Sequence, residues 1–307
     1  MNNVYIRSKD NLKNIMFKTI LALIPLILAG FYKNGIKLYI NDYVSFYAML
    51  KPLIFDLLGF IIGIIVNIIY SSIIKKDLSI KESCFSSFHP LYGILIASII
   101  SINTRIWLFS LVTFIFLLIS KFINKNNINI IALTSLSLIF ITKFIYGFTF
   151  LNVYEQSNTL NLVALDYLIG RGSGGINTSH VLLLAFSLII LCNIRTFKKE
   201  IPIYSSATYS LCMIVYCTLT NQIGFILDNI FANGILFSFV FVATDSLSSS
   251  YTNKGKIIYS IIIGIATFGL FLVYPPLSAM GGILIASICH KTIDNLVLKN
   301  MAKKWLK

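Results

Sequence analysis

The sequence predicts an all-α integral membrane protein with about ten transmembrane helices. The chain of 307 residues is 57% hydrophobic and only 12% charged, and its mean hydropathy is +0.85. Soluble domains carry about 25% charged residues, so this composition excludes an ordinary soluble protein. The apolar residues also form continuous runs that approach the ~20 residues of a spanning helix, unlike the short alternating segments of a membrane β-barrel.

The hydrophobic runs divide the chain into predicted spans separated by polar segments. The first run is "IMFKTILALIPLILAGFY", which we interpret as an uncleaved first helix because it lacks a cleavage site of the A-x-A kind. Hydropathy and length predict spans at residues 14–32, 53–74, 88–103, 106–123, 128–148, 179–195, 202–220, 222–243, 257–275 and 279–298.

The basic residues predict the orientation of these spans. About three quarters of the 25 Lys and Arg residues fall in segments on the side of the N-terminus, which the positive-inside rule makes cytoplasmic. Both termini are therefore expected in the cytoplasm. The net charge of +14 is explained by these loops, so the lipid bilayer is the predicted partner and nucleic acid is not.

The longest polar loop separates two sets of five spans. The predicted organisation is a first helical half at 1–148, an outer loop at 149–178 and a second helical half at 179–307. An odd number of spans in each half would make the two halves inverted relative to each other, as in many transport folds.

Cysteine and histidine side chains give no indication of a metal site. The five cysteines contain no C-x-x-C pair, and the three histidines are scattered along the chain. Iron–sulfur ligation needs closer clustering, so we interpret the cysteines as small apolar packing residues.

Carboxylates within the apolar runs are candidates for an ion pathway, because such groups face a cavity or a partner in membrane proteins. Asp228 interrupts "GFILDNIFANGILF", and together with Asn233 it predicts a broken helix. Asp245 ends the eighth span, where it could cap the helix or bind an ion. Asp56 and Asp294 are expected to be interfacial residues.

The stretch "RGSGGINTSH", from Arg171 to His180, precedes the sixth span. Its glycines and hydroxyls offer two interpretations. The first is a flexible loop in which Thr178 or Ser179 caps the following helix. The second is a site for a phosphate at the free N–H groups of that helix N-terminus.

Several motifs together resemble the RnfD/NqrB family. "FVATDSLSSSYTNKGKIIYSIIIG" is similar to a family signature of the form A-T-D-P-V-[ST]-A-S followed by T-N-[KR]-G-[KR]. "YPPLSAMGGILIASICHKTID" resembles the segment that follows it, and "IRSKDNLKNIM" matches the start of the family. "LDYLIGRGSGGINTS" resembles a loop that ends in G-E-[TV]-S. The resemblance covers nearly the whole chain.

The resemblance implies a membrane subunit of an ion-translocating oxidoreductase in the bacterial inner membrane. Such complexes couple electron flow to Na⁺ or H⁺ transport, and the partners would be the other membrane and redox subunits. The family carries FMN esterified to a threonine, and riboflavin is a further candidate cofactor. The expected ion pathway consists of Thr244, Asp245 and Asp228. The expected FMN-binding residues are Thr159, Arg171, Ser173, Thr178 and Ser179.

The sequence also departs from the family pattern. The flavin attachment motif D-x-x-[ST]-x-A-T is represented by "VYEQSNT", in which Val153 and Asn158 replace the aspartate and the alanine and Thr159 remains. Asn177 replaces the glutamate of the loop motif. Covalent attachment of FMN through Thr159 is therefore in question.

Two alternatives remain open at the level of sequence. One is a non-redox scaffold subunit that has lost its flavin, and the other is a secondary transporter or permease. The few residues before "IRSKD" favour the RnfD type of the Rnf complex over the quinone reductase branch. No soluble domain is predicted, so chemistry on NADH or ferredoxin would belong to partner subunits.

Overall fold

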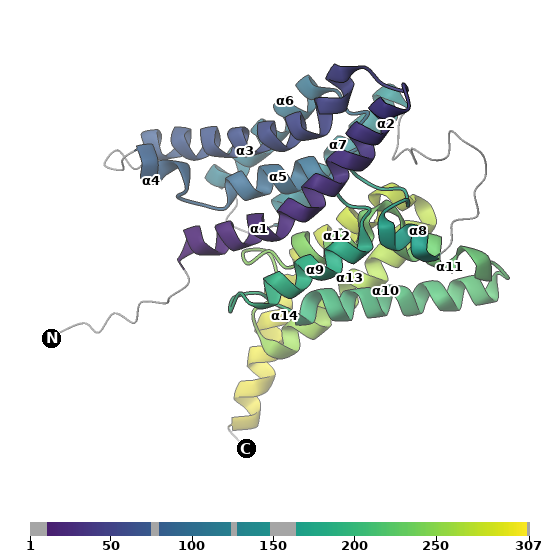
Figure 1. The fold of residues 1–307 in the computed structure, drawn as a ribbon. Helices are drawn as coiled ribbons and strands as arrows, with labels where there is room; N and C mark the ends of the chain where they lie inside the picture. The colour runs from purple at the N-terminus through teal and green to yellow at the C-terminus, as the bar shows by residue number, and fades with distance from the viewer. Residues whose placement is uncertain (1–10, 75–79, 124–127, 148–163, 306–307) are drawn as a thin grey trace.

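A computed structural model describes residues 11–74, 80–123, 128–147 and 164–305. Within these residues every regular element is helical, which confirms the predicted all-α class. The helices lie side by side in one bundle, with α4 at one end and α8 and α11 at the other (Figure 1). We call the end that carries the start of α1 the inner end and the opposite end the outer end, following the predicted orientation.

The first half of the chain contributes seven α-helices. The first of them, α1, continues through a π-helical turn, η1, directly into α2, so the chain stays helical from Leu12 to Ile40. The elements are α1 (Leu12–Phe31), η1 (Tyr32–Ile36), α2 (Lys37–Ile40), α3 (Phe46–Ile74), α4 (Ile80–Cys84), α5 (His89–Ile99), α6 (Ile106–Ile123) and α7 (Ile130–Tyr146).

The second half contains an interrupted span between longer helices. Its elements are α8 (Ala164–Ile169), α9 (Val181–Cys192), α10 (Glu200–Leu219), η2 (Ile223–Phe225), α11 (Ile226–Phe231), η3 (Ala232–Gly234), α12 (Ile235–Phe237), η4 (Ser238–Val242), α13 (Asn253–Val273) and α14 (Pro275–Trp305). Helical structure is therefore present at each of the ten predicted spans.

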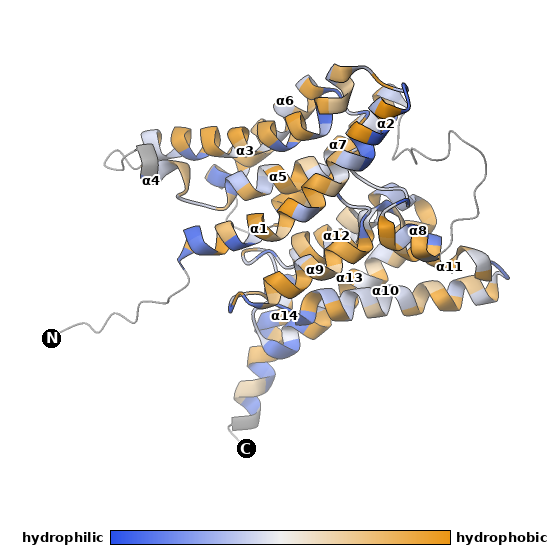
Figure 2. Cartoon of the chain, in the orientation of Figure 1, coloured by the Kyte–Doolittle hydropathy of each residue, from blue (hydrophilic) through white to orange (hydrophobic). Residues whose placement is uncertain are grey.

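Five helical segments among the described residues are long and apolar enough to cross a membrane. They are Leu12–Ile40, Phe46–Ile74, Ile223–Val242, Asn253–Val273 and Pro275–Lys303. The apolar helices α5, α6, α7 and α9 are shorter. Hydrophobic residues occur along most of the helices, whereas the last turns of α14 contain many hydrophilic residues (Figure 2). This distribution suits a bundle whose sides face lipid.

Glycines allow α5 to lie at the centre of the bundle, where all of its residues are buried. A Cβ atom on Gly59 of α3 would lie 2.3 Å from the carbonyl oxygen of Gly93 in α5. A Cβ atom on Gly63 would lie 2.4 Å from the carbonyl oxygen of His89. Small residues permit such backbone contact between membrane helices, so α3 and α5 pack more closely than larger side chains would allow.

The predicted break in the eighth span is confirmed. Asn233 and Gly234 have φ angles of 57° and 66°, so the chain passes through the left-handed region between α11 and α12. The backbone N–H of Asn233 is taken by the carbonyl of Ser173, at 2.9 Å. The outer loop therefore supplies a hydrogen-bond acceptor for a backbone N–H group that the break leaves without a partner in its own helix.

The helix of the third span ends before the predicted boundary at residue 103. α5 ends at Ile99, and Ile100 is extended with ψ 163°. The carbonyls of Ser98 and Ile100 accept hydrogen bonds from the backbone N–H groups of Asn177 and Ile176, at 3.1 and 3.0 Å. The inverted relation of the two halves stays a prediction.

Two carboxylates that were expected at the membrane interface are buried inside the protein. Asp56 and Asp294 were expected at the interface, but their exposed fractions are 6% and 1%. Asp294 is buried because the 250–252 turn folds onto it with hydrogen-bond donors. Asp56 is buried because the outer loop covers it.

Candidate functional site

The structure places Asp245 in the turn after η4, with both carboxylate oxygens hydrogen-bonded. The Tyr92 hydroxyl donates to Oδ1 at 2.7 Å, and the Ser248 hydroxyl donates to Oδ2 at 2.7 Å. Tyr92 belongs to the buried helix α5, so this contact joins the third and eighth spans. The carboxylate is half-buried and keeps lone pairs beyond these two bonds.

Asp245 follows the end of η4, and a residue from another part of the chain binds this helix end. The last turn, η4, is π-helical, and the carbonyl of its final residue, Val242, accepts a hydrogen bond from Asn129 Nδ2 at 2.8 Å. Asn129 also caps α7, because its Oδ1 accepts from the backbone N–H of Ala132 at 3.0 Å. One side chain thus fixes both the start of α7 and the position from which the Asp245 turn leaves.

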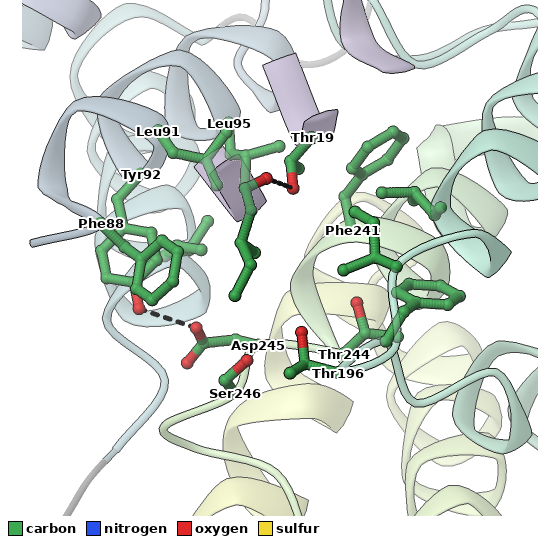
Figure 3. A pocket seen from close by; sticks show the side chains of 15 residues that line it. Thr19, Phe88, Leu91, Tyr92, Leu95, Thr196, Phe241, Thr244, Asp245 and Ser246 are labelled. Atoms are coloured by element: carbon green, nitrogen blue, oxygen red, sulfur yellow. Dashed lines mark hydrogen bonds between the residues drawn. The ribbon is translucent and has the colours of Figure 1, made fainter. Parts of the chain in front are cut away.

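A cavity of about 60 Å³ lies beside Asp245 at the inner end of the bundle (Figure 3). Its polar lining comes from four different segments of the chain and includes Thr19, Tyr92, Thr196, Thr244 and Asp245. A buried water needs roughly 10–15 Å³ of such volume, so the cavity has room for a few waters or a partly hydrated ion. It is far too small for a flavin.

The hydroxyls around this cavity are oriented as acceptors. Thr19 Oγ1 donates its hydrogen to the carbonyl of Ile15 at 2.8 Å, and Thr244 Oγ1 donates to Val240 at 2.6 Å. A hydroxyl has one hydrogen and two lone pairs, so both oxygens still present lone pairs. Together with the Asp245 carboxylate, these are the oxygen ligands that hard cations prefer.

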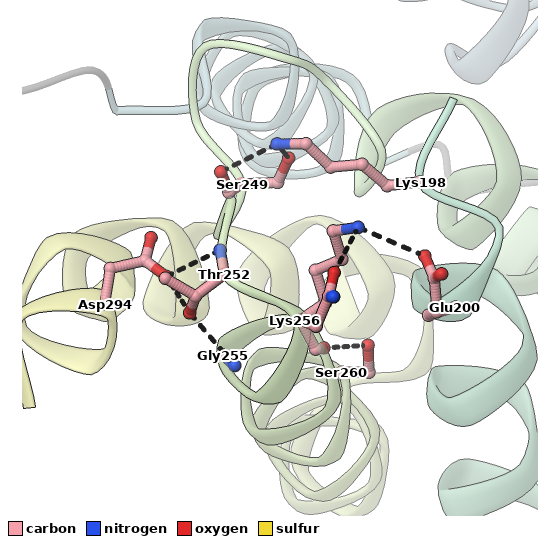
Figure 4. Close-up of polar contacts among 9 residues, drawn as sticks. Lys198, Glu200, Ser249, Thr252, Gly255, Lys256, Ser260 and Asp294 are labelled. Atoms are coloured by element: carbon pink, nitrogen blue, oxygen red, sulfur yellow. Dashed lines mark hydrogen bonds and ion pairs between the residues drawn. The ribbon is translucent and has the colours of Figure 1, made fainter. Parts of the chain in front are cut away.

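The hydroxyl-rich turn after Asp245 is held by Asp294 of α14 (Figure 4). Asp294 Oδ1 accepts hydrogen bonds from the hydroxyls of Ser250 and Thr252, at 2.5 and 2.6 Å. The backbone N–H groups of Thr252 and Tyr251 donate to Oδ1 and Oδ2, each at 3.1 Å. The Thr252 hydroxyl in turn accepts from Gly255 N and so caps α13.

Lys198 is the cation nearest to this turn among the described contacts. Its ammonium donates to the carbonyl and the hydroxyl of Ser249, at 2.9 and 2.6 Å (Figure 4). Burial lowers the pKa of Lys198 to about 8, although the negative charge of Asp245 acts in the opposite direction. The site thus combines one carboxylate with a lysine that titrates close to neutral pH.

Three of the predicted cofactor-binding residues come together in the outer loop, but they serve to hold it in place. Lys33 of η1 donates to the carbonyl of Gly172 at 2.7 Å and to Ser179 Oγ at 2.9 Å. Thr178 Oγ1 donates to Gly175 at 3.3 Å, and the Ser173 carbonyl binds the broken span. The structure corrects the expected cap: the N-cap of α9 is His180 rather than Thr178 or Ser179, and its side chain makes no capping bond.

The remaining predicted residues lie elsewhere. Arg171 pairs with Asp166 at 2.6 Å, and 48% of its side chain is exposed. Asp228 lies in α11, on the outer side of the break, where it accepts from the Tyr167 hydroxyl at 2.9 Å. It does not line the cavity beside Asp245. Thr159 lies outside the described residues.

Several residues of the site were not singled out by the sequence. Because the first predicted span ends at residue 32, Lys33 and Asn34 were expected to lie just outside it. The structure places both inside the continuous helix, and both are buried. Tyr92, Lys198 and Asn129 carried no local signal, because their partners are distant in sequence.

Comparison with known proteins is consistent with this architecture. The model of the NQR2, RnfD, RnfE family matches residues 1–303. The chain is 34% identical over 105 residues to a Na(+)-translocating NADH-quinone reductase subunit of Stutzerimonas stutzeri, covering 31% of this chain and 26% of the relative. It is 29% identical over 149 residues to the subunit of the same name from Azotobacter vinelandii, covering 45% and 36%.

The match to a relative of the same name from Pseudomonas paraeruginosa has 27% identity over 158 residues, and it covers 47% of this chain and 38% of that relative. The chain thus matches well under half the length of each of these curated relatives. The family match, in contrast, extends over nearly all of the chain. We conclude that this all-α membrane protein belongs to the NQR2, RnfD, RnfE family.

Proposed function

We propose that the protein is a membrane subunit of an ion-translocating oxidoreductase complex, and that Asp245 is a ligand on its ion pathway. The observation that carries this proposal is the half-buried Asp245 carboxylate beside a cavity lined by acceptor hydroxyls. Relatives that are named as subunits of a Na(+)-translocating NADH-quinone reductase support the same class of function. The other membrane and redox subunits of such a complex would be its partners.

The cavity favours a small monovalent cation. One carboxylate balances one positive charge, and the hydroxyl oxygens of Thr19 and Thr244 can replace water around Na⁺. Asp245 keeps its position without the ion, because Tyr92 and Ser248 donate to it. The site is therefore preorganised, and it lies near the end of the bundle where the predicted orientation places the cytoplasm. Asp228, at the other end of the same span, would belong to the outer part of the pathway.

The test of the pathway is ion transport by the assembled complex in sealed vesicles. We expect Asp245→Asn to abolish ion uptake driven by electron transfer, because the amide nearly retains the shape but removes the charge. The control is Asp166→Asn, which alters an ion pair at the outer end. Full uptake by the Asp245→Asn complex would remove Asp245 from the pathway.

Electron transfer through FMN is a separate part of the proposal, and it depends on Thr159. The described residues do not form a site for the FMN phosphate: Thr178 and Ser179 are buried, and the exposed Arg171 pairs with Asp166. The proposed attachment is therefore the ester to Thr159 alone. When bound, the flavin would supply one- and two-electron redox chemistry.

This poor fit favours a second candidate, a scaffold subunit that retains the ion pathway and has lost its flavin. Flavin fluorescence of the denatured, purified chain separates the two. A fluorescent band that disappears in Thr159→Ala would establish the flavoprotein. A dark wild-type band in a complex that still transports ions would establish the scaffold, and a dark band without redox partners would establish a transporter.

A further inference from the structure

The outer half of the bundle contains another buried carboxylate that the ion pathway does not use. Asp56 lies in α3 between Phe55, which is fully buried, and the contact of Gly59 with α5. Only 6% of Asp56 is exposed. An ionised carboxylate in such surroundings needs a positive partner, because burying an unpaired charge costs several kcal/mol or more.

Asp56 has a single described partner, the side-chain amide of Asn177 in the outer loop. Asn177 Nδ2 lies 3.1 Å from Asp56 Oδ1, 3.0 Å from Asp56 Oδ2 and 3.1 Å from Ser98 Oγ. An amide nitrogen has two hydrogens, so it cannot satisfy three acceptors. The Oδ1 atom of the same amide has no hydrogen-bond partner, although Asn177 is completely buried.

The cations around this part of the bundle have other partners. Lys33 of η1 donates to Gly172 and Ser179, and Lys51, one turn before Asp56, lies over the Phe55 ring at 5.7 Å. Arg105, before α6, lies over the Tyr146 ring at 4.7 Å. Lys37 follows Lys33 by one turn and is half-buried. The described ion pairs include none with Asp56.

The other titratable groups that pack against α3 or the loop are also engaged elsewhere. In α5, His89 contacts Ser87 and Ser120, and Tyr92 donates to Asp245 at the inner end. Beside the loop, Arg171 pairs with Asp166. His180 is the exception, since its buried Nε2 has no hydrogen-bond partner among the described residues.

We propose that Asp56 is a proton-binding site and that it forms a carboxylic acid–amide pair with Asn177. A protonated carboxyl has one O–H donor and one carbonyl acceptor, and a primary amide offers the complementary set. With the amide turned in its plane, Asp56 O–H donates to Asn177 Oδ1 while Asn177 Nδ2 donates to the other carboxyl oxygen. This arrangement gives the orphaned Oδ1 a donor and removes the unpaired charge.

A proton suits this geometry better than a metal cation does. The amide nitrogen already lies within hydrogen-bond distance of both carboxyl oxygens, so no ion can lie between the two groups. The proton lies next to a contact between two segments, because the backbone N–H groups of Asn177 and Ile176 donate to carbonyls at the end of α5. The protonated pair thus helps to join the outer loop to the end of α5. This inference requires neither the flavin nor the ion pathway.

The test is infrared spectroscopy of the purified full-length chain at neutral pH. A carboxylic acid has a C=O stretching band above the amide I band, whereas a carboxylate does not. We expect a band that is lost in Asp56→Asn and kept in Asp228→Asn, the control at a half-buried carboxylate. We also expect this band to move to higher frequency in Asn177→Leu, which removes the hydrogen bonds to the acid.

The opposite results would overturn the proposal. A wild-type spectrum from which Asp56→Asn removes only carboxylate bands would show that Asp56 is ionised. If Asp56→Asn does not yield folded protein, the Asn177→Leu spectrum decides alone: an acid band at the same frequency as in wild type would exclude the pair. Because Asn resembles a protonated carboxyl in shape and charge, we expect Asp56→Asn to fold.

Discussion

Replacing Asp294 by alanine would test how the turn that carries Asp245 is held. Asp294 is the single acceptor for four donors, namely the hydroxyls of Ser250 and Thr252 and the N–H groups of Tyr251 and Thr252. All four lie in one short turn, and the carboxylate is 1% exposed. No other described side chain accepts from these two N–H groups, so the alanine variant leaves them without a partner inside the protein.

The size of the effect follows from these two backbone donors. A buried N–H group that loses its acceptor costs about 1–3 kcal/mol, and these two bonds are only partly buried, so the low end applies and the two together cost about 2 kcal/mol. The hydroxyls of Ser250 and Thr252 add less, because they can rotate to other acceptors. We therefore expect Asp294→Ala to lower the free energy of unfolding by roughly 2 kcal/mol.

Equilibrium unfolding of the detergent-solubilised chain measures this change. A matched control is Asp166→Ala, since Asp166 pairs with an exposed arginine and such pairs contribute about 1 kcal/mol or less. Ser250→Ala should weaken the wild-type protein but have little further effect in the Asp294→Ala background, because the two residues share one hydrogen bond. Equal losses for Asp294→Ala and Asp166→Ala would refute the reasoning.

Three further changes have expected outcomes. Gly234→Ala should destabilise the chain by more than about 1 kcal/mol, because φ is +66° and the new Cβ would lie 2.5 Å from Thr178 Oγ1; unchanged unfolding would contradict this. The pKa of Lys198 is about 8 in the folded chain and about 10.4 in the unfolded chain, so between these pH values the folded chain binds fewer protons. Stability should therefore rise with pH across that window in wild type and not in Lys198→Met. Asn129→Ala should cost about 0.5–2 kcal/mol through the lost cap, and faster hydrogen exchange near Val242 should accompany it.

The sequence predicts the helices well because lipid imposes length and apolarity on each span. It predicts their ends poorly where polar residues remain helical or apolar residues leave the helix. Lys33 continues the first helix because the Gly172 carbonyl and the Ser179 hydroxyl accept its ammonium hydrogens. Ile100 leaves α5 because Ile176 donates to its carbonyl. Both results depend on contacts with the outer loop, which lies far away in the sequence.

The candidate site shows the same division. Asp245 could be located from sequence because a carboxylate at the end of an apolar run is rare and costly. The hydroxyls of the 248–252 turn were expected near it; those of Ser248 and Ser249 do bind Asp245, whereas those of Ser250 and Thr252 bind Asp294, whose burial was not expected. The loop residues Thr178 and Ser179 were chosen for their chemistry, yet the structure uses that chemistry for packing. A short polar motif alone does not indicate which of these uses applies.

The surroundings of the two carboxylates show why we propose Asp245, and not Asp56, as the ion ligand. Close to each carboxylate, an asparagine from a distant segment binds a carbonyl near the end of a helix: Asn129 binds Val242 at the end of η4, and the Asn177 backbone N–H binds Ser98 in α5. Beside α5 the Asn177 side chain also covers the Asp56 carboxylate, which leaves space only for a proton. At the end of η4, Asn129 binds the Val242 carbonyl, and Asp245 lines the cavity. An ion that reaches Asp245 would therefore find oxygen acceptors in place.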